Sequence, residues 1–387
     1  MGEVVKEVTR NDPTSEAPIM MITANNGFIE QSERYAFDNA GESLKKYILL
    51  QKGELAYNHG ASKLRPFGSC FALTTAESAR IPFVYHCFSA ENQNAEFLSI
   101  ELNGSEVESQ LRKIVSSGAR MDGLLNISFD EYSTVTVLLP DIKEQEHIAD
   151  FFRNLDHLIT LHQRKYDKLQ VLKKAMLEKM FPKNGSSVPE IRFKGFTDAW
   201  EQRKLSEIAG KVTEKNTGLQ YVETLTNSAE FGIISQRDFF DHDISKLGSL
   251  DGYYIVRNED FVYNPRISTS APVGPINRNK LGRTGVMSPL YTVFRPHDID
   301  TTYLEHFFKC GYWYSFMNFN GDSGARSDRF SIKDDVFFQM PIPVPHIEEQ
   351  RKIGLFLTQL DQLITLHQRE LEKLQNIKKS MLEKMFV

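Results

Sequence analysis

Hydrophobic positions recur every seven residues in two segments of this 387-residue chain. In the first segment one series is Ile148, Leu155, His162, Leu169 and Met176, and the complementary series is Phe152, Ile159, Tyr166 and Met180, with Lys173 as its break. In the second segment the two series are Ile353, Leu360, His367, Leu374 and Met381, and Leu357, Ile364, Leu371 and Met385, with Lys378 as the break. The pattern predicts two helices of about 60 Å that pack together as a coiled coil.

The two helical segments are copies of one another. Ile142 to Phe181 and Ile347 to Phe386 align without a gap at an offset of 205, and 25 of the 40 positions are identical. Such a duplication indicates two-fold pseudosymmetry and a partner that has two ends or two copies. Two separate surface helices are the alternative to mutual packing. The residues expected in the coiled-coil and partner interface are Phe152, Leu155, Ile159, His162, Tyr166, Leu169, Leu357, Leu360, Ile364, His367, Leu371 and Leu374.

Each helix carries an apolar stripe that is wider than a two-helix seam. The additional positions are Phe151, Leu158, Leu172, Phe356, Leu363 and Ile377. These side chains leave room for partner helices beside the seam. The equivalent His162 and His367 are expected to form a hydrogen-bonded polar pair that sets helix register, with metal binding as the less favoured alternative.

The regions before the two helices read as related modules of mixed structure. Strand-like runs at Tyr47–Leu50, Phe83–Tyr85, Val135–Leu138 and Tyr254–Val256 alternate with helical stretches at Ser105–Val115 and Thr302–Cys310, which is typical of an α+β fold. Tyr47–Asn58 resembles Tyr254–Asn264, whereas the sequences between such matching segments differ almost completely. We expect one architecture with two different ligands, arranged as module 1–141, spacer helix 142–181, linker 182–196, module 197–346 and spacer helix 347–387, the two helices forming an antiparallel coiled coil.

Composition limits the class of protein. The net charge of −5 argues against uniform coating of nucleic acid but permits a local basic surface. No run approaches the ~18 apolar residues of a membrane span. Cys70, Cys87 and Cys310 have no CxxC spacing and are expected to be reduced thiols of a cytoplasmic protein.

Catalytic motifs are absent from the sequence. It contains no GxGxxG, no phosphate loop, no HExxH and no metal-type Cys/His spacing. The run from Asn264 to Ile267 superficially resembles the Asn-Pro-Pro-aromatic loop of amino-methyltransferases, but it lacks the second proline and the aromatic residue. A turn at the end of a strand is the better interpretation.

Two loop regions are basic and free of acidic residues. Phe261 to His297 contains five cations and no Asp or Glu, and Leu55 to Ala76 likewise has no acidic residue. Arg, Asn, Ser and Thr are the side chains that contact phosphates and base edges, so we expect DNA contacts here, with a solvated loop as the alternative. Two arginines that follow Ser-Gly-Ala turns are further candidates, although either can be a salt-bridged structural residue. The predicted DNA-binding residues are Asn58, Lys63, Arg65, Arg120, Tyr263, Asn264, Arg266, Arg278, Lys280, Arg283 and Arg326.

These features together resemble the DNA specificity subunit of type I restriction–modification systems. The residues that carry the resemblance are the PxxxEQxxI leads at Pro140 and Pro345, FxxLDxLITLHQR followed by KxMLEKMF in both helices, FTDAWEQRKL at Phe196–Leu205, and FVYNP at Phe261–Pro265. The resemblance implies a non-catalytic reader of a bipartite, asymmetric DNA site with one target recognition domain for each half. It also implies an antiparallel coiled coil that docks two methyltransferase subunits and, in the full complex, motor-nuclease subunits. S-adenosylmethionine, ATP and Mg²⁺ would belong to those partners, and no cofactor to this chain.

One departure concerns the first module. Phe196–Leu205 introduces the second module, whereas the chain begins inside the repeat at Gly2. The first module is therefore expected to lack a strand or an equivalent of Trp200. Two competing functions are a protein-interaction scaffold that does not bind DNA and a self-sufficient methyltransferase or nuclease, which the absent cofactor and metal motifs disfavour.

Overall fold

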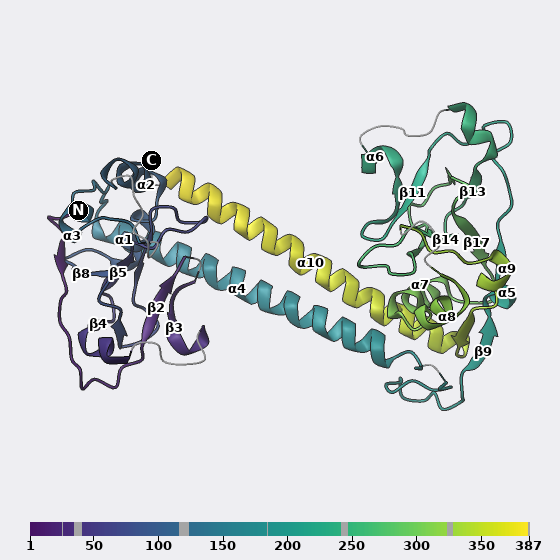
Figure 1. Cartoon of the computed structure of the whole chain (residues 1–387), viewed down its shortest axis with the longest axis horizontal. Helices are drawn as coiled ribbons and strands as arrows, with labels where there is room; N and C mark the ends of the chain where they lie inside the picture. Colours follow the sequence, from purple (N-terminus) through teal and green to yellow (C-terminus); the bar gives the residue numbers. More distant parts are fainter. Residues whose placement is uncertain are drawn as a thin grey trace. The chain divides into compact units, whose positions relative to one another are not determined.

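The computed structural model describes residues 1–24, 26–34, 41–115, 124–183, 185–240, 247–322 and 328–385. The chain divides into two compact units (Figure 1). Unit 1 comprises Met1–Gln163 and Arg369–Val387, and unit 2 comprises Arg164–Gln368. Each unit therefore contains one mixed module and part of both long helices.

Among its described residues, the module of unit 1 is built from short antiparallel strands, three α-helices and two 3-10 helices. Its main sheet has the order β1-β8-β5-β6, and the pairs β2-β3 and β4-β7 lie outside it. The strands are β1 (Val5–Glu7), β2 (Met20–Thr23), β3 (Gly27–Glu30), β4 (Ile48–Gln51), β5 (Leu55–Asn58), β6 (Ser69–Ala72), β7 (Ser78–Ile81) and β8 (His86–Ala90). The helices are η1 (Gln31–Glu33), η2 (Gly41–Lys46), α1 (Ala95–Glu101), α2 (Ser105–Ile114) and α3 (Phe129–Ser133).

The module of unit 2 repeats this order and this pairing. Its main sheet is β10-β17-β14-β15, with β11-β12 and β13-β16 outside it, and it has one further pair, β18-β9. The strands are β9 (Glu201–Lys204), β10 (Ala209–Lys211), β11 (Leu225–Ser228), β12 (Gly232–Ser235), β13 (Tyr254–Val256), β14 (Phe261–Tyr263), β15 (Ile276–Arg278), β16 (Gly285–Met287), β17 (Thr292–Pro296) and β18 (Pro341–Val344). The helices are α5 (Leu205–Ile208), α6 (Gln236–Phe240), η3 (Leu247–Gly252), α7 (Thr301–Cys310), α8 (Tyr314–Asn320) and α9 (Asp334–Phe337). The predicted α+β class with two similar modules is confirmed.

A tyrosine and a glycine stabilise the same turn in both modules. Tyr57 donates a hydrogen bond to the carbonyl of Phe67 at 2.5 Å, and Tyr263 donates to the carbonyl of Val273 at 2.9 Å. The residue after each carbonyl is a glycine with positive φ, Gly68 at +83° and Gly274 at +86°. The tyrosine rings are buried, so these turns join the sheet to the core.

The long helices α4 (Ile142–Lys179) and α10 (Ile347–Met385) pair in an antiparallel manner within each unit (Figure 1). In unit 1 Lys378 of α10 donates to Asp156 of α4 at 2.5 Å. In unit 2 Lys173 of α4 forms an ion pair with Asp361 of α10. The two pairs are related by the offset of 205, so the lysines that interrupt the apolar series each bind the aspartate of the other copy.

A glutamine fixes the start of each long helix. Gln145 accepts a hydrogen bond from the N–H of Asn94 at 3.0 Å and donates to the carbonyl of Pro140 at 2.9 Å. Gln350 does the same with Asp300 at 2.9 Å and Pro345 at 2.8 Å. Both glutamines are buried, so the PxxxEQ motif joins the long helix to the N-cap of α1 or α7.

Two of the predicted strands are wrong. Phe83–Tyr85 lies in a turn after β7, and Val135–Leu138 has no strand partner among the described residues. In the first case Pro82 ends the strand, because proline lacks the N–H that a ladder needs.

Gly274→Ala is expected to destabilise unit 2 by about 3 kcal/mol, because a Cβ there would lie 2.1 Å from the Asn264 carbonyl oxygen at a left-handed φ. The control Gly282→Ala has a φ of +68° with nothing within 4 Å and should cost only about 1 kcal/mol. Both tryptophans of the chain, Trp200 and Trp313, are buried in unit 2. Tryptophan fluorescence during urea unfolding therefore measures this unit, and equal midpoints for the two variants would contradict the expectation.

Candidate nucleic-acid interface

Arg278 is one of the predicted DNA-binding cations, and its side chain is held inside unit 2. It forms ion pairs with Glu259 at 2.9 Å and Glu305 at 2.6 Å, and its side chain is 10% exposed. A guanidinium in this position stabilises the junction of β15 and α7. In this conformation it is not available to DNA.

Glu305 is the centre of an ionic cluster. Lys280 and Lys309 bind this carboxylate at 2.7 and 2.9 Å, and Lys309 also lies 3.8 Å from Asp361 of α10. Burial by itself raises the pKa of Glu305, but the two lysine ammonium groups outweigh it and lower the pKa to about 2. The cluster thus joins the module of unit 2 to both long helices through charges.

Arg283 and Arg266 differ in how they are engaged. Arg283 forms a bidentate pair with Glu223 at 2.7 and 2.8 Å, although half of its side chain is exposed. Arg266 is exposed, and its side chain has no ion-pair partner among the described residues. A free exposed arginine after β14 is the better candidate for contact with a polyanion.

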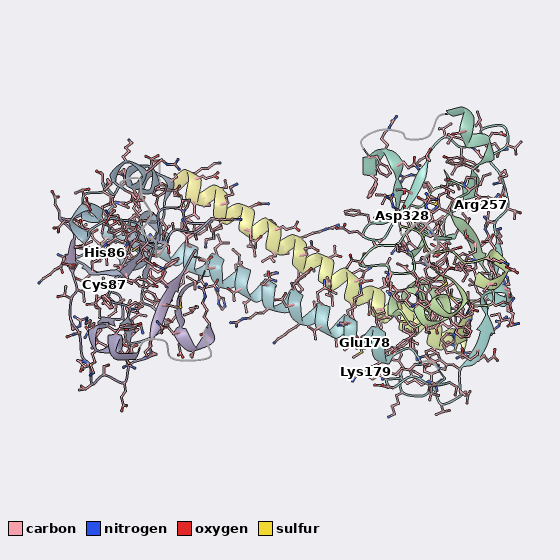
Figure 2. The ribbon with its side chains drawn as sticks, in the orientation of Figure 1. His86, Cys87, Glu178, Lys179, Arg257 and Asp328 are labelled. Carbon is pink, nitrogen blue, oxygen red and sulfur yellow. The ribbon has the colours of Figure 1, made fainter. Side chains whose placement is uncertain are left out.

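Arg329 lies opposite Arg266. The two residues form an antiparallel bridge, in which Phe330 donates to the Pro265 carbonyl at 2.7 Å and Ile267 to the Asp328 carbonyl at 3.0 Å. Asp328 is labelled in Figure 2 and marks this place in unit 2. Two arginines that face each other repel unless an anion lies between or above them. Arg329 was not predicted, because only the pairing of these distant segments brings it beside Arg266.

A cavity of about 520 Å³ opens beside this arginine pair. Its lining includes aromatic, hydroxyl and charged side chains, among them Tyr254, Tyr291, Ser331 and Arg329. Lys211 also lines it and forms an ion pair with Asp334, which lies in the same lining. Leu290 at its rim is 60% exposed. A cavity lined by such groups suits a nucleotide better than a flat phosphate backbone.

The predicted asparagines and tyrosine have structural contacts in both modules. Asn58 donates to the Ile22 carbonyl at 3.0 Å and accepts from the N–H of Gly60 at 2.9 Å. Asn264 donates to the Asn227 carbonyl at 2.8 Å and accepts from the N–H of Arg266 at 3.0 Å. These amides, with buried Tyr263, connect the main sheet to a hairpin and shape the turn that precedes the candidate cations.

The first module presents different side chains at the equivalent place. Gly60 and Leu124 form the bridge that corresponds to Arg266 and Arg329. Lys63 is exposed, whereas Arg65 donates to the Asn103 carbonyl at 2.8 Å, and burial lowers its pKa. The two modules thus have one framework and different exposed chemistry.

Arg120 and Arg326 lie outside the described residues. The twelve predicted seam residues are all buried or half-buried, including the two histidines. In the described part of the chain, no cluster of three His, Cys, Asp or Glu could hold a metal ion. No helix in that part is long and apolar enough to cross a membrane.

The fold and these side chains define a class of protein: two copies of one module, each attached to a duplicated helix, with cations displayed on one module. Residues 197–376 match the model of the family described as "Type I restriction modification DNA specificity domain". The specificity subunit of the type I restriction enzyme MjaVIII from Methanocaldococcus jannaschii is 23% identical over 300 residues, which cover 74% of this chain and 67% of that protein. The putative MjaX specificity subunit of the same organism is 25% identical over 275 residues, or 66% of this chain and 60% of that protein.

A solved structure, the S subunit of a type I restriction–modification system from M. genitalium, has the same fold. Its TM-score is 0.50 at 13% identity, and the match covers 100% of this chain and 94% of that one. The matches confirm the predicted resemblance, with residues 197–376 matching the model of the type I DNA specificity domain. They support the predicted role in DNA sequence specificity, as a non-catalytic subunit, over the scaffold alternative. DNA, modification subunits and restriction subunits are the partners that this role implies.

Acid is expected to destabilise unit 2 through His306, which is buried beside the ionic cluster and donates to or accepts from Thr358 at 3.2 Å. Burial, with the charge of Lys309, lowers the pKa of His306 from 6.5 to about 3. The unfolded chain therefore binds a proton below pH 6.5 that the folded unit does not, and stability falls as pH drops from 6.5 toward 3, by at most about 1.4 kcal/mol per pH unit.

Between pH 6.5 and 4.5 the His306→Gln variant should lose most of this dependence in urea unfolding followed by tryptophan fluorescence. Glu305 contributes mainly below this range, because its stabilisation is lost as the pH falls from 4.5, the pKa of the unfolded chain, toward the folded pKa of about 2. His297→Gln, at a histidine whose side chain is 52% exposed, serves as the control and should behave as the parent. An unchanged slope in His306→Gln would contradict the assignment.

Proposed function

We propose that the chain reads a bipartite, asymmetric DNA site, with one half-site bound by each module. The observation that carries this proposal is the shared framework with unlike exposed residues, Arg266 and Arg329 in one module against Gly60 and Leu124 in the other. Identical modules would select two identical half-sites, whereas unlike side chains on one framework select two different ones. The Arg266 and Arg329 pair, with the cavity beside it, reads the second half-site.

The long helices serve as the spacer between the two half-sites and as the docking surface for partners. Helices α4 and α10 contain 38 and 39 residues, so each is about 57 Å long at ~1.5 Å per residue. Partner methyltransferase subunits, two in number, dock on equivalent faces of the two helices, and restriction subunits join them. S-adenosylmethionine, ATP and Mg²⁺ belong to those partners, so the isolated chain binds DNA without modifying it.

Equivalent exposed leucines support two docking surfaces. Leu158 and Leu363, related by the offset of 205, are each 44% exposed, and Leu161 and Leu366 are 38% and 52% exposed. These leucines lie outside the seam and face solvent at matching positions of the two copies. Exposed apolar groups that occur in pairs are the anchors expected for two copies of one partner.

Arg266→Ala is expected to weaken binding of the DNA target by about 1–3 kcal/mol, since it removes a contact to a base or phosphate of the second half-site. Fluorescence anisotropy with the target, and with targets changed in either half, separates the two kinds of contact. A lost base contact relaxes selectivity at one position of the second half-site, and a lost phosphate contact weakens all targets alike.

Arg257→Ala is the matched control, because Arg257 is equally basic but pairs with Glu214 at 2.9 Å near the other end of β14. The affinity of this variant for the DNA target should equal that of the parent.

Arg278→Ala should reduce the stability of unit 2, since it leaves Glu305 and Glu259 with one cation fewer. Full affinity in the double variant Arg266→Ala with Arg329→Ala would contradict the proposed surface.

Leu363→Asp is expected to remove one of two bound methyltransferase subunits, and Leu158→Asp together with Leu363→Asp should remove both. A charge buried in an apolar interface reduces the binding free energy far more than the loss of the leucine contact alone. Native mass spectrometry of the reconstituted complex counts the bound subunits. Gln362→Asp places the same charge one residue away at an exposed polar site and should keep two. Two bound subunits in the double leucine variant would contradict this docking surface.

A further inference from the structure

One tight turn occupies the same place in both modules. In unit 2 residues 288–291 join β16 to β17, and in unit 1 residues 82–85 join β7 to β8. In each turn the N–H of the fourth residue donates to the carbonyl of the first, at 3.1 Å in unit 2 and 3.0 Å in unit 1. Thr292 and His86, which directly follow the turns, pair with the buried tyrosines of β14 and β5, so the two turns are equivalent. His86 is labelled in Figure 2.

The tips of both turns expose large apolar side chains. Leu290 is 60% exposed in unit 2, and Phe83 and Val84 are 49% and 38% exposed in unit 1. A single exposed apolar residue is ordinary, but exposure at one place in two modules that differ in sequence indicates a contact surface. Phe231, at the tip of the β11-β12 hairpin, is also exposed, but the residue at the equivalent place in unit 1 is Asn26.

In unit 2 this turn borders the candidate DNA surface. Leu290 lines the cavity that Pro265 and Arg329 also line. The Pro265 carbonyl accepts a hydrogen bond from the N–H of Phe330 at 2.7 Å, within the bridge between Arg266 and Arg329. The exposed leucine therefore lies beside the arginine pair.

In unit 1 a buried histidine joins the turn to the equivalent bridge. The two ring nitrogens of His59 lie 2.7 Å from the carbonyl oxygens of Val84 and Leu125. Gly60 and Leu124, the next neighbours of His59 and Leu125, form the bridge itself. The turn thus has the same position relative to the bridge in both modules.

A cation lies beside each apolar tip. In unit 1 the ammonium group of Lys46 lies 6.0 Å from the centre of the Phe83 ring. In unit 2 Arg329 lines the same cavity as Leu290. Neither turn contains an acidic residue that would repel phosphates. Basic groups beside an exposed apolar side chain are the combination with which proteins enter and unstack a base step.

We propose that the two turns are wedges, in which Leu290 of unit 2, and Phe83 with Val84 of unit 1, enter a base step of DNA and kink the duplex. This inference rests on the proposed function and adds a contact of another kind to it. The neighbouring cations bind phosphates, and the apolar side chain replaces the stacking contact that the separated base pairs lose. A wedge needs bulk and apolar character but no hydrogen bond, so the two turns can differ in residue while they act alike.

The test uses the full chain and a duplex that the chain selects from a random-sequence library. Dyes at the two ends of the duplex report its bend by energy transfer. The base analogue 2-aminopurine, placed at one position at a time, becomes brighter where stacking is lost. The parent chain is expected to kink the duplex by about 20–90° at a step within each half-site.

Variants assign each kink to its turn. Leu290→Ala should remove the kink and the 2-aminopurine signal of the second half-site and keep those of the first, and Phe83→Ala together with Val84→Ala should do the reverse. Val222→Ala, at a residue of unit 2 that is 65% exposed outside the turn, is the control and should keep both signals. Because all of these side chains are exposed, urea unfolding followed by circular dichroism should give the parent midpoint for every variant.

The outcomes separate this inference from the DNA-reading function. A selected duplex that the parent binds without a kink, or that Leu290→Ala still kinks in both halves, would overturn the wedges and leave DNA reading intact. Selection of no duplex would overturn both. If the kinks persist in Leu290→Ala but native mass spectrometry shows the loss of a methyltransferase subunit, the turn contacts a protein and the wedge assignment is wrong.

Discussion

The structure depends on a helix that is complementary to its own copy. Asp156 of α4 binds Lys378 of α10, and Lys173 of α4 binds Asp361 of α10, so one aspartate and one lysine in a repeat satisfy both copies when the helices are antiparallel. In a parallel arrangement the offset of 205 would place each lysine beside a lysine. A partly exposed ion pair contributes little free energy, so the apolar seam supplies stability and the ion pairs supply orientation.

The second constraint is that the residues that hold the fold of each module are different from the residues that it exposes. The tyrosine, asparagine and glycine that follow β5 and β14 bind backbone groups in both modules, and their hydrogen bonds hold the turn in the same shape. Because the contacts of this turn involve backbone carbonyls, the residues beyond it can differ without loss of the fold. The bridge that holds Arg266 and Arg329 in one module holds Gly60 and Leu124 in the other. A protein family that changes its DNA target requires this independence.

Much of the fold could be predicted from periodicity, and most of the site could not. The helices, their matching register and the strands at Ile48 and Tyr254 follow from patterns within one segment. Contacts between distant segments determine whether each arginine is held in an ion pair or exposed, and the sequence contains no signal for those contacts. Arg278 and Arg266 look alike in a basic loop, yet Glu305 of α7 encloses the first and only the second is exposed. The strand pattern of Val135–Leu138 was real, but a ladder needs a partner strand as well as a pattern.

The two modules attach to the shared helices by different chemistry. In unit 2, α7 places Glu305 and His306 against α10, and the lysines around Glu305 form a cluster with Asp361. At the same positions after the N-cap, α1 of unit 1 has Ser99 and Ile100. The module of unit 1 contacts the long helices through an apolar group of Phe97, Ile148 and Phe152 with Leu382, and through an ion pair of Arg153 with Glu96 at 2.8 Å. Apolar contacts are insensitive to protonation, whereas buried charges are not. The ion pair of unit 1 is partly exposed, whereas Glu305 and His306 of unit 2 are buried. Acid therefore loosens the second module before the first while the helices keep one register, because buried charges depend more strongly on protonation.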